Sequence, residues 1–255
     1  MSVLATIVIC AVLGPWIAPD SPTVQDLALG EVPPTPRHLA GTDALGRDVL
    51  SRVVHGARTA LVGPALVAAG AYAVATVLGL LSGFFGGLPD IVVMRSVDFV
   101  IALPEALVAI VVVGVVGGGY WTAVLVLVVL FTAPATRVIR AAVMEQRSTP
   151  YIDAARLLGV SVPRILVVHI LPNVRPIVGA YAMLDFAFAF ISLIGLSFLG
   201  VGAPPGSLDW GRMVYENRTL LFTNPAGLLL PATTILLTAV SINLIGDWLS
   251  ERPTR

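Results

Sequence analysis

The sequence predicts an all-α membrane protein with about six transmembrane helices, on the usual length of a span. Its 255 residues are 57% hydrophobic and only 12% charged, and the mean hydropathy is +0.93. A soluble domain typically carries about twice that charged fraction. Long uncharged runs alternate with shorter polar stretches along the whole chain. We therefore expect one integrated transmembrane domain that covers residues 1–255.

The charged residues and the cysteine count exclude several functions. The formal net charge is zero, so no basic surface points to nucleic acid. Every basic residue is an arginine, since the chain contains no lysine. A phosphate-binding loop and a Schiff-base enzyme both need a lysine, so this chain is neither a P-loop ATPase nor such an enzyme. The single cysteine, Cys10, excludes an intrachain disulfide and a thiol pair for a metal.

Six hydrophobic segments are long enough to be candidate spans. We expect them at residues 1–18, 59–87, 98–117, 120–140, 176–199 and 225–244. The first could be a cleaved signal peptide, but it lacks a positive n-region and a cleavage site. The lack of a basic residue before it leaves a start upstream of Met1 open. Gly79, Gly83 and Gly87 recur at four-residue spacing in the second segment, which predicts close helix packing.

Residues 19–58 form a polar segment between the first two spans. Four prolines lie between Pro22 and Pro36, so the segment begins extended. From Asp43 onward the apolar residues fall on one face of a helix, with Asp48 and Arg52 one turn apart on the polar side. The pattern predicts an amphipathic helix, capped by Asp43, that lies on the membrane surface and leads into the second span.

A second polar stretch lies within residues 141–175, between two hydrophobic blocks. Thr149 is a suitable helix cap, Pro150 suits the first helical position, and Gly159 supplies a stop. Ser161 is then expected to cap a second helix that runs toward Leu171 and Pro172. Ala154 and Ala155 give the first helix a low-relief face that another protein could approach closely. A hairpin that merely links two spans is the alternative interpretation.

One acid lies well inside a predicted span. An ionisable side chain at that depth in the bilayer costs free energy. We therefore expect Asp185 to face the bundle interior and to contact a substrate amine or a partner subunit. A packing residue at a subunit interface is the alternative. Other acids lie beside Arg95 at a membrane boundary, where ion pairing is favoured over acid–base catalysis: Asp90, Asp98 and Glu105. The three histidines show no metal-ligand spacing and are predicted to make separate hydrogen bonds: His38, His55 and His169.

Arginine placement predicts the orientation. The side that holds the 141–175 stretch also receives Arg95, Arg137, Arg140, Arg147, Arg156, Arg164, Arg175, Arg252 and Arg255. The opposite side receives Arg37, Arg47, Arg52, Arg58, Arg212 and Arg218. The excess of arginine predicts that the first side is cytoplasmic, with both termini on it.

The residues of the second polar stretch resemble a known family. Asp153-Ala154-Ala155, Gly159 and Leu171-Pro172 match the EAA loop of ABC importer permease subunits, E-A-A-x3-G-x9-I-x-L-P. GTDALGRDVLSR at 41–52, HILPN at 169–173, LSFLGVG at 196–202 and NLIGD at 243–247 are similar to the C-type permease subunit of dipeptide and oligopeptide importers. These motifs follow one another in the family's order over most of the chain.

The resemblance implies a type I ABC importer permease fold in a bacterial or archaeal cytoplasmic membrane. It implies a homologous B-type permease, two cytoplasmic ATPases that bind ATP and Mg²⁺, and an extracytoplasmic substrate-binding protein as partners. This chain would have no catalytic site, cofactor or metal. The implied ATPase-coupling residues are Asp153, Ala154, Ala155, Arg156, Gly159, Leu171 and Pro172. The implied extracytoplasmic motif comprises Gly41, Thr42, Asp43, Gly46, Arg47, Asp48 and Arg52.

The sequence departs from the family pattern at three positions. Asp153 stands where the motif has glutamate, His169 stands at the motif's isoleucine, and Leu193 replaces an acid that many relatives carry before LSFLG. Two other classes of function are kept as alternatives. One is a secondary transporter or channel that uses Asp185, against which no inverted repeat and no second intramembrane acid are seen. The other is a non-transporting membrane scaffold or sensor.

Overall fold

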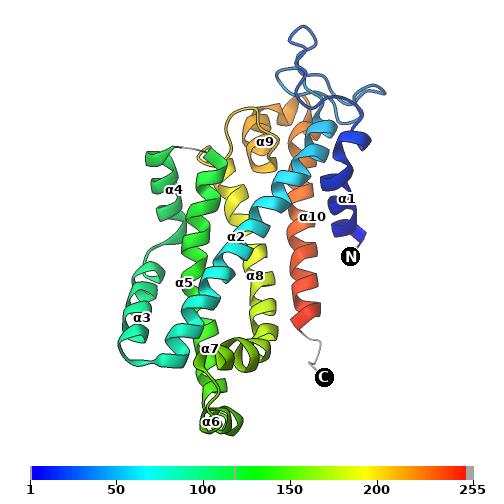
Figure 1. The fold of residues 1–255 in the computed structure, drawn as a ribbon. Coiled ribbons are helices and arrows are strands. Elements are labelled where there is room, and N and C mark those ends of the chain that lie inside the picture. Colours follow the sequence, from blue (N-terminus) through cyan, green and yellow to red (C-terminus); the bar gives the residue numbers. More distant parts are fainter. Residues whose placement is uncertain (1, 118, 251–255) are drawn as a thin grey trace.

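The computed structural model describes residues 2–117 and 119–250, and every regular element in this part of the chain is helical (Figure 1). The α-helices are α1 (Ser2–Ile17), α2 (Val49–Phe85), α3 (Gly87–Ile101), α4 (Glu105–Val116), α5 (Gly119–Arg147), α6 (Pro150–Leu157), α7 (Val162–Arg164), α8 (Leu171–Phe198), α9 (Trp210–Glu216) and α10 (Pro225–Ser250). A π-helical stretch, η1 (Ile165–Ile170), joins α7 to α8, and a 3-10 helix, η2 (Asn217–Phe222), follows α9.

Four helical runs are long and apolar enough to cross a membrane: Val49–Phe85, Gly119–Arg147, Val162–Phe198 and Pro225–Gly246. The helices α3 and α4 together provide a fifth, bent by 85°. The segment predicted as the first span forms a shorter apolar helix, Val3–Ile17. The prediction of an all-α membrane protein is therefore confirmed, with four or five full spans and one shorter apolar helix where about six spans were expected.

The third predicted span differs from the prediction in shape and in its start. The chain is already helical from Gly87, so Asp98 lies near the end of α3 and does not begin a span. Pro104 then precedes α4, and the residue before a proline is disfavoured in the α conformation. The bend at residues 102–104 is the physical result of that proline.

The centre of the bundle is the packing of α2 against α5. A Cβ added to Gly83 would lie 2.8 Å from Val143 Cβ and 2.9 Å from the Arg140 carbonyl oxygen, and one added to Gly79 would meet Ile139. These two glycines therefore allow the two backbones to approach, as their spacing predicts. Gly87 does not take part, because it starts α3 with φ of +60° and has no neighbour within 4 Å of its Cβ position.

The amphipathic helix predicted from Asp43 begins later than expected. Asp48 is the N-cap of α2, and its carboxylate accepts a hydrogen bond from the Ser51 backbone N–H. Asp43 instead closes a turn, since its side chain accepts from the backbone N–H groups of Leu45 and Arg47. Helix α2 then continues without interruption to Phe85, so the amphipathic helix and the second span are one 37-residue helix.

The predicted second helix of the 141–175 stretch also differs. Helix α7 has only 3 residues, and the π-helical η1 leads directly into α8 at Leu171. Pro172 therefore lies in the first turn of α8, where a missing backbone N–H costs little, and does not end a helix. The fifth span begins before Pro176, which lies inside α8.

Candidate functional site

Two groups of residues that the sequence marked as functional lie at opposite ends of the bundle. The 19–48 segment and α9 lie at the upper end in Figure 1, and α6 projects from the lower end. Helix α2 connects the two ends, because it starts beside the 19–48 segment and finishes near α6 (Figure 1).

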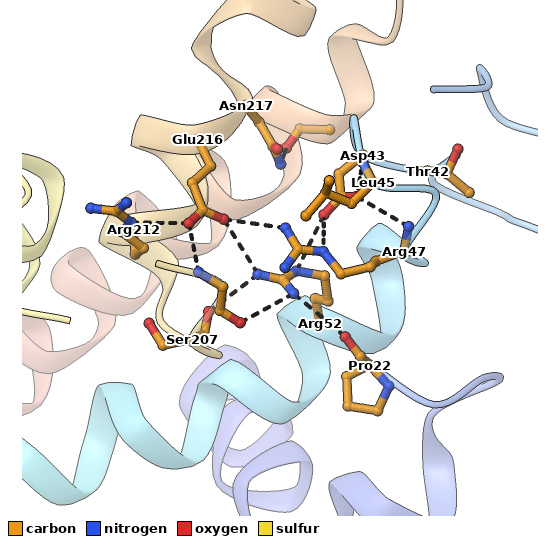
Figure 2. A network of polar contacts seen from close by, with 12 residues as sticks. Pro22, Thr42, Asp43, Leu45, Arg47, Arg52, Ser207, Arg212, Glu216 and Asn217 are labelled. Atoms are coloured by element: carbon orange, nitrogen blue, oxygen red, sulfur yellow. Dashed lines mark hydrogen bonds and ion pairs between the residues drawn. The ribbon is translucent and has the colours of Figure 1, made fainter. Parts of the chain in front are cut away.

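At the upper end five charged side chains form a polar cluster, shown in Figure 2: Asp43, Arg47, Arg52, Arg212 and Glu216. The Arg47 guanidinium bonds Asp43 at 2.7 Å and Glu216 at 3.3 Å. Arg52 is only 1% exposed, and it reaches the carboxylate of Glu216 at 3.6 Å and the Ser207 carbonyl at 3.2 Å. Three arginines thus share two carboxylates in a buried site.

Glu216 lies at the centre of this cluster. One carboxylate oxygen accepts from the Gly206 backbone N–H at 2.8 Å and from Arg212 at 3.0 Å, and the other faces Arg47 and Arg52. Burial alone would raise the pKa of Glu216, but these hydrogen bonds and the arginine charges together hold its pKa below the ordinary value of 4.5. Glu216 is therefore a carboxylate at neutral pH, and it joins α9 to the start of α2.

The sequence prediction that Asp48 and Arg52 lie on a polar, solvated helix face is wrong. Asp48 is 3% exposed and Arg52 is 1% exposed. Besides Pro22 and Asp43, the partners of Arg52 come from residues 206–216, more than 150 positions away, so periodicity along one helix could not indicate them. Asp209 and Trp210 were also missed, although Trp210 Nε1 donates to the Val53 carbonyl at 2.8 Å and fixes α9 on α2.

The remaining residues of the predicted extracytoplasmic motif build the turn that holds this cluster. Gly41 and Gly46 both have φ of +70°, a conformation that favours glycine. Thr42 pairs with Asp48 across the turn, and its hydroxyl donates to the Gly30 carbonyl at 2.7 Å. Asn224, which precedes α10, donates to the Thr42 carbonyl at 3.0 Å. The motif therefore closes the 19–48 segment on itself at Gly30 and anchors it on a distant part of the chain at Asn224.

At the lower end α6 follows the predicted boundaries. Thr149 is at the N-cap position and Pro150 at the first helical position, although the Thr149 hydroxyl donates back to the Gln146 carbonyl and does not cap α6. Gly159 ends the helix with φ of +74°, as predicted. Asn173 donates to the Tyr151 hydroxyl at 2.8 Å, which joins α6 to the first turn of α8.

The two alanines of α6 face in different directions. Ala155 is 8% exposed and packs, with the fully buried Ile152, in a core cluster formed with α2, α5 and η1. The prediction that Ala155 lies on the accessible face is therefore wrong. Ala154 is exposed, and Leu157 and Leu158 are 89% and 83% exposed. The accessible face of α6 is thus small and apolar.

Charged residues border that face. Arg156 lies over the Phe84 ring at 5.1 Å and bonds Asp153 at 3.4 Å. A hollow of about 450 Å³ beside α6 is lined by Met144, Arg147, Ser148, Asp153 and Arg156. A partner that binds here would meet both exposed leucines and arginine side chains.

Asp185 is half-buried in α8, and a second acid shares its cavity. A cavity of about 270 Å³ is lined by both Asp185 and Glu105, the first residue of α4. The Tyr72 hydroxyl bonds Asp185, and Ser192 Oγ donates to Glu105 at 2.8 Å. The interpretation of Asp185 as a solitary acid is therefore wrong. The ion pairing predicted for the other acids is confirmed for two of them, since Asp90 pairs with Arg140 and Asp98 with Arg137.

Residues 75–255 match the family model of the binding-protein-dependent transport system inner membrane component. The chain belongs to this family of transport permeases.

Two curated relatives match nearly the whole chain. The di/tripeptide transport system permease protein DppC of Pseudomonas aeruginosa is 36% identical over 96% of this chain and 83% of its own length. The dipeptide transport system permease protein DppC of Haemophilus influenzae is 32% identical over 96% of this chain and 85% of its own length. A chain of the MetNI methionine ABC transporter, solved in inward facing conformations, has the same fold, with a TM-score of 0.63 at 17% identity over 80% of this chain and 97% of its own length.

Proposed function

We propose that this chain is the transmembrane permease subunit of an ATP-driven importer for di- or oligopeptides. The named functions of the two DppC relatives support the substrate class. The geometry of α6 carries the coupling part of the proposal, because a short helix that projects from the bundle with an exposed apolar face needs a protein partner.

The proposed partner of α6 is a cytoplasmic ATPase subunit. Two such subunits would bind ATP and Mg²⁺, since this chain lacks the lysine of a phosphate-binding loop. This chain would then have no catalytic site of its own. A homologous B-type permease would complete the pathway, and a substrate-binding protein would deliver the peptide on the opposite side. ATP can shift the permease between two conformations only if the ATPases bind it more tightly in one of them.

The proposed orientation follows from that assignment. With α6 in the cytoplasm, the 19–48 segment and α9 lie outside, and the polar cluster stiffens the surface that would meet the binding protein. Asp185 remains a candidate for the pathway or for the contact with the second permease. A secondary transporter is the alternative function, and uptake by vesicles that contain this chain without any ATPase would favour it.

The test uses a matched pair of substitutions on α6. In the complex reconstituted with its partner ATPases, Ala154→Trp is expected to abolish peptide uptake and its coupling to ATP hydrolysis, because it blocks the exposed face while the helix stays in place. Ala5→Trp puts the same side chain on an exposed site of α1, outside both candidate sites, and should insert, assemble and hydrolyse ATP normally. Normal coupled uptake in Ala154→Trp would overturn the coupling role of α6.

Gly159→Pro provides a second variant with a different mechanism. Proline fixes φ near −65°, whereas Gly159 has φ of +74°. The chain would therefore leave α6 in a different direction, and the orientation of α6 on the bundle would change. We expect membrane insertion without coupled uptake. Wild-type uptake in this variant would contradict the proposed role of the α6 orientation.

A further inference from the structure

The 19–48 segment brings an imidazole and two carboxylates together at one place. These are the side chains of Asp20, His38 and Asp48. The Nδ1 atom of His38 lies 3.0 Å from Asp48 Oδ1 and 3.8 Å from Asp20 Oδ2. The three potential ligand atoms all lie within 4.8 Å of one another. We propose that these residues bind a divalent transition-metal ion of the Zn²⁺ class, which holds the start of the 19–48 segment on the first turn of α2.

The distances between the ligand atoms fit such an ion. Nitrogen and oxygen ligands lie about 2.0–2.2 Å from Zn²⁺, which places two ligands of a tetrahedral site roughly 3.4 Å apart. The separations of His38 from Asp48 and from Asp20, 3.0 and 3.8 Å, bracket that value. The Asp20 and Asp48 oxygens lie within 4.8 Å of each other, and the exposed Asp20 side chain would rotate to close on the ion. An imidazole with carboxylates suits Zn²⁺ and related ions, whereas Ca²⁺ and Mg²⁺ take oxygen ligands. The chemistry of the three side chains therefore selects the class of metal.

Ser51 holds two of the three ligands in position. Its backbone N–H donates to Oδ2 of Asp48 at 2.7 Å, which leaves Oδ1 directed at His38. Its hydroxyl accepts from the backbone N–H of Asp20 at 3.0 Å. Ser51 is completely buried. Asp20 and Asp48 are thus both oriented by one buried residue in the first turn of α2, and partners that orient the ligands strengthen metal binding.

His38 is held by a further bond. Its backbone N–H donates to Thr35 Oγ1 at 3.1 Å, within a turn that the Thr35 N–H closes on the His38 carbonyl at 2.8 Å. The imidazole is therefore fixed beside Asp48 by the local backbone. No sequence motif indicates this site, because the three ligands are separated by 18 and 10 positions (38 − 20 and 48 − 38) and match no metal-binding spacing.

The site is buried on one side and open on the other. Asp48 has a side-chain exposure of 2% and His38 of 13%, whereas Asp20 is 46% exposed. All three residues line a cavity of about 400 Å³, which gives an ion an entry path and leaves room for a water ligand. A divalent cation would neutralise the two carboxylates, while an ion pair of a protonated His38 would neutralise only one. The metal therefore satisfies the charges of the site more completely.

The experiment measures Zn²⁺ binding by the complex purified with its partner subunits. The complex is stripped with a chelator, desalted and titrated with Zn²⁺ against a chromogenic chelator, and bound zinc is counted by mass spectrometry. The wild-type complex is expected to bind one Zn²⁺ more than Asp20→Asn and His38→Asn, with an affinity at this site about tenfold or more above that of either variant. Glu31→Gln removes an exposed carboxylate from the same segment and should behave as wild type.

A second measurement, proteolysis of the 19–48 segment, distinguishes loss of the metal site from misfolding of a variant. Asp20→Asn leaves the Asp48 cap of α2 intact, so the protein should assemble, and Zn²⁺ should slow proteolysis of the 19–48 segment in wild type but not in this variant. Equal zinc content and equal proteolysis in wild type, Asp20→Asn and His38→Asn would overturn the proposal in favour of a simple His38–Asp48 hydrogen bond. Displacement of Zn²⁺ by an equal concentration of Mg²⁺ would overturn the metal class. Neither readout depends on transport, so the result is independent of the proposed function.

Discussion

Glu216→Gln should destabilise the upper end of the molecule through charge alone. Three arginines and two carboxylates give the polar cluster a net charge of +1, which rises to +2 when Glu216 is neutralised. Removal of one partner from a buried ion pair costs about 3–5 kcal/mol. Glu216 is 18% exposed, and glutamine still accepts the Gly206 hydrogen bond, so we expect the lower end, about 3 kcal/mol. At about 2–4 °C per kcal/mol for a chain of this size, the apparent Tm should fall by about 6–12 °C.

The assay is thermal unfolding of the detergent-purified protein, followed by intrinsic tryptophan fluorescence. Trp210 begins α9 and is 1% exposed, so its emission reports the loss of packing beside the cluster. Glu31→Gln serves as the control, because it removes the same charge from an exposed site. An apparent Tm of Glu216→Gln within about 2 °C of wild type, in a protein of this size, would refute the view that the cluster stabilises the fold through its charges.

Three further predictions concern pH, packing and the intramembrane acids. The pKa of Glu216 is below 4.5 in the folded protein, so the Glu216 carboxylate stabilises the fold above about pH 4.5. This stabilisation is lost as the pH falls toward the folded pKa. Below about pH 4.5 the apparent Tm of wild type should therefore drop more than that of Glu216→Gln. Gly83→Leu should cost about 1–3 kcal/mol against Val143 and the α5 backbone, while Gly114→Leu, which has no neighbour within 4 Å of its Cβ position, should leave the apparent Tm unchanged. Asp185→Asn should lower peptide uptake with normal assembly, and wild-type uptake would remove Asp185 from the pathway.

The features that depend on neighbouring residues in the sequence could be predicted. Hydrophobic runs predicted the spans, and Gly159 predicted the end of α6. The spacing of Gly79 and Gly83 predicted close helix packing, which the structure shows against α5. Each of these follows from local backbone chemistry or from the helical repeat. The four or five full spans of the structure are consequently close to the expected number.

The features that depend on distant residues could not be predicted. Arg52 has the spacing of an exposed i,i+4 partner of Asp48, yet residues from α9 and the loop before it bury it. Ala155 belongs to a recognisable motif, but which side of α6 faces the bundle is decided by where α5 and η1 lie. Glu105 follows a proline at a predicted membrane boundary, and only the bend between α3 and α4 places it at the cavity of Asp185.

Helix α2 connects the two candidate sites mechanically. Its first turn holds Arg52 in the polar cluster, and its last turn holds Phe84, whose ring lies under Arg156 of α6. The glycine contacts fix α2 on α5, so the two helices can shift only together. Regular helical hydrogen bonding is interrupted at the 85° bend between α3 and α4 and at the π-helical η1 between α6 and α8. It also loses one bond inside each of α2 and α5, at Pro64 and Pro134. If α6 is the coupling helix, we expect a force on it to reach the opposite end through Phe84 and the packed pair α2 and α5, and the bundle to yield at the bend, at η1 and at the two prolines.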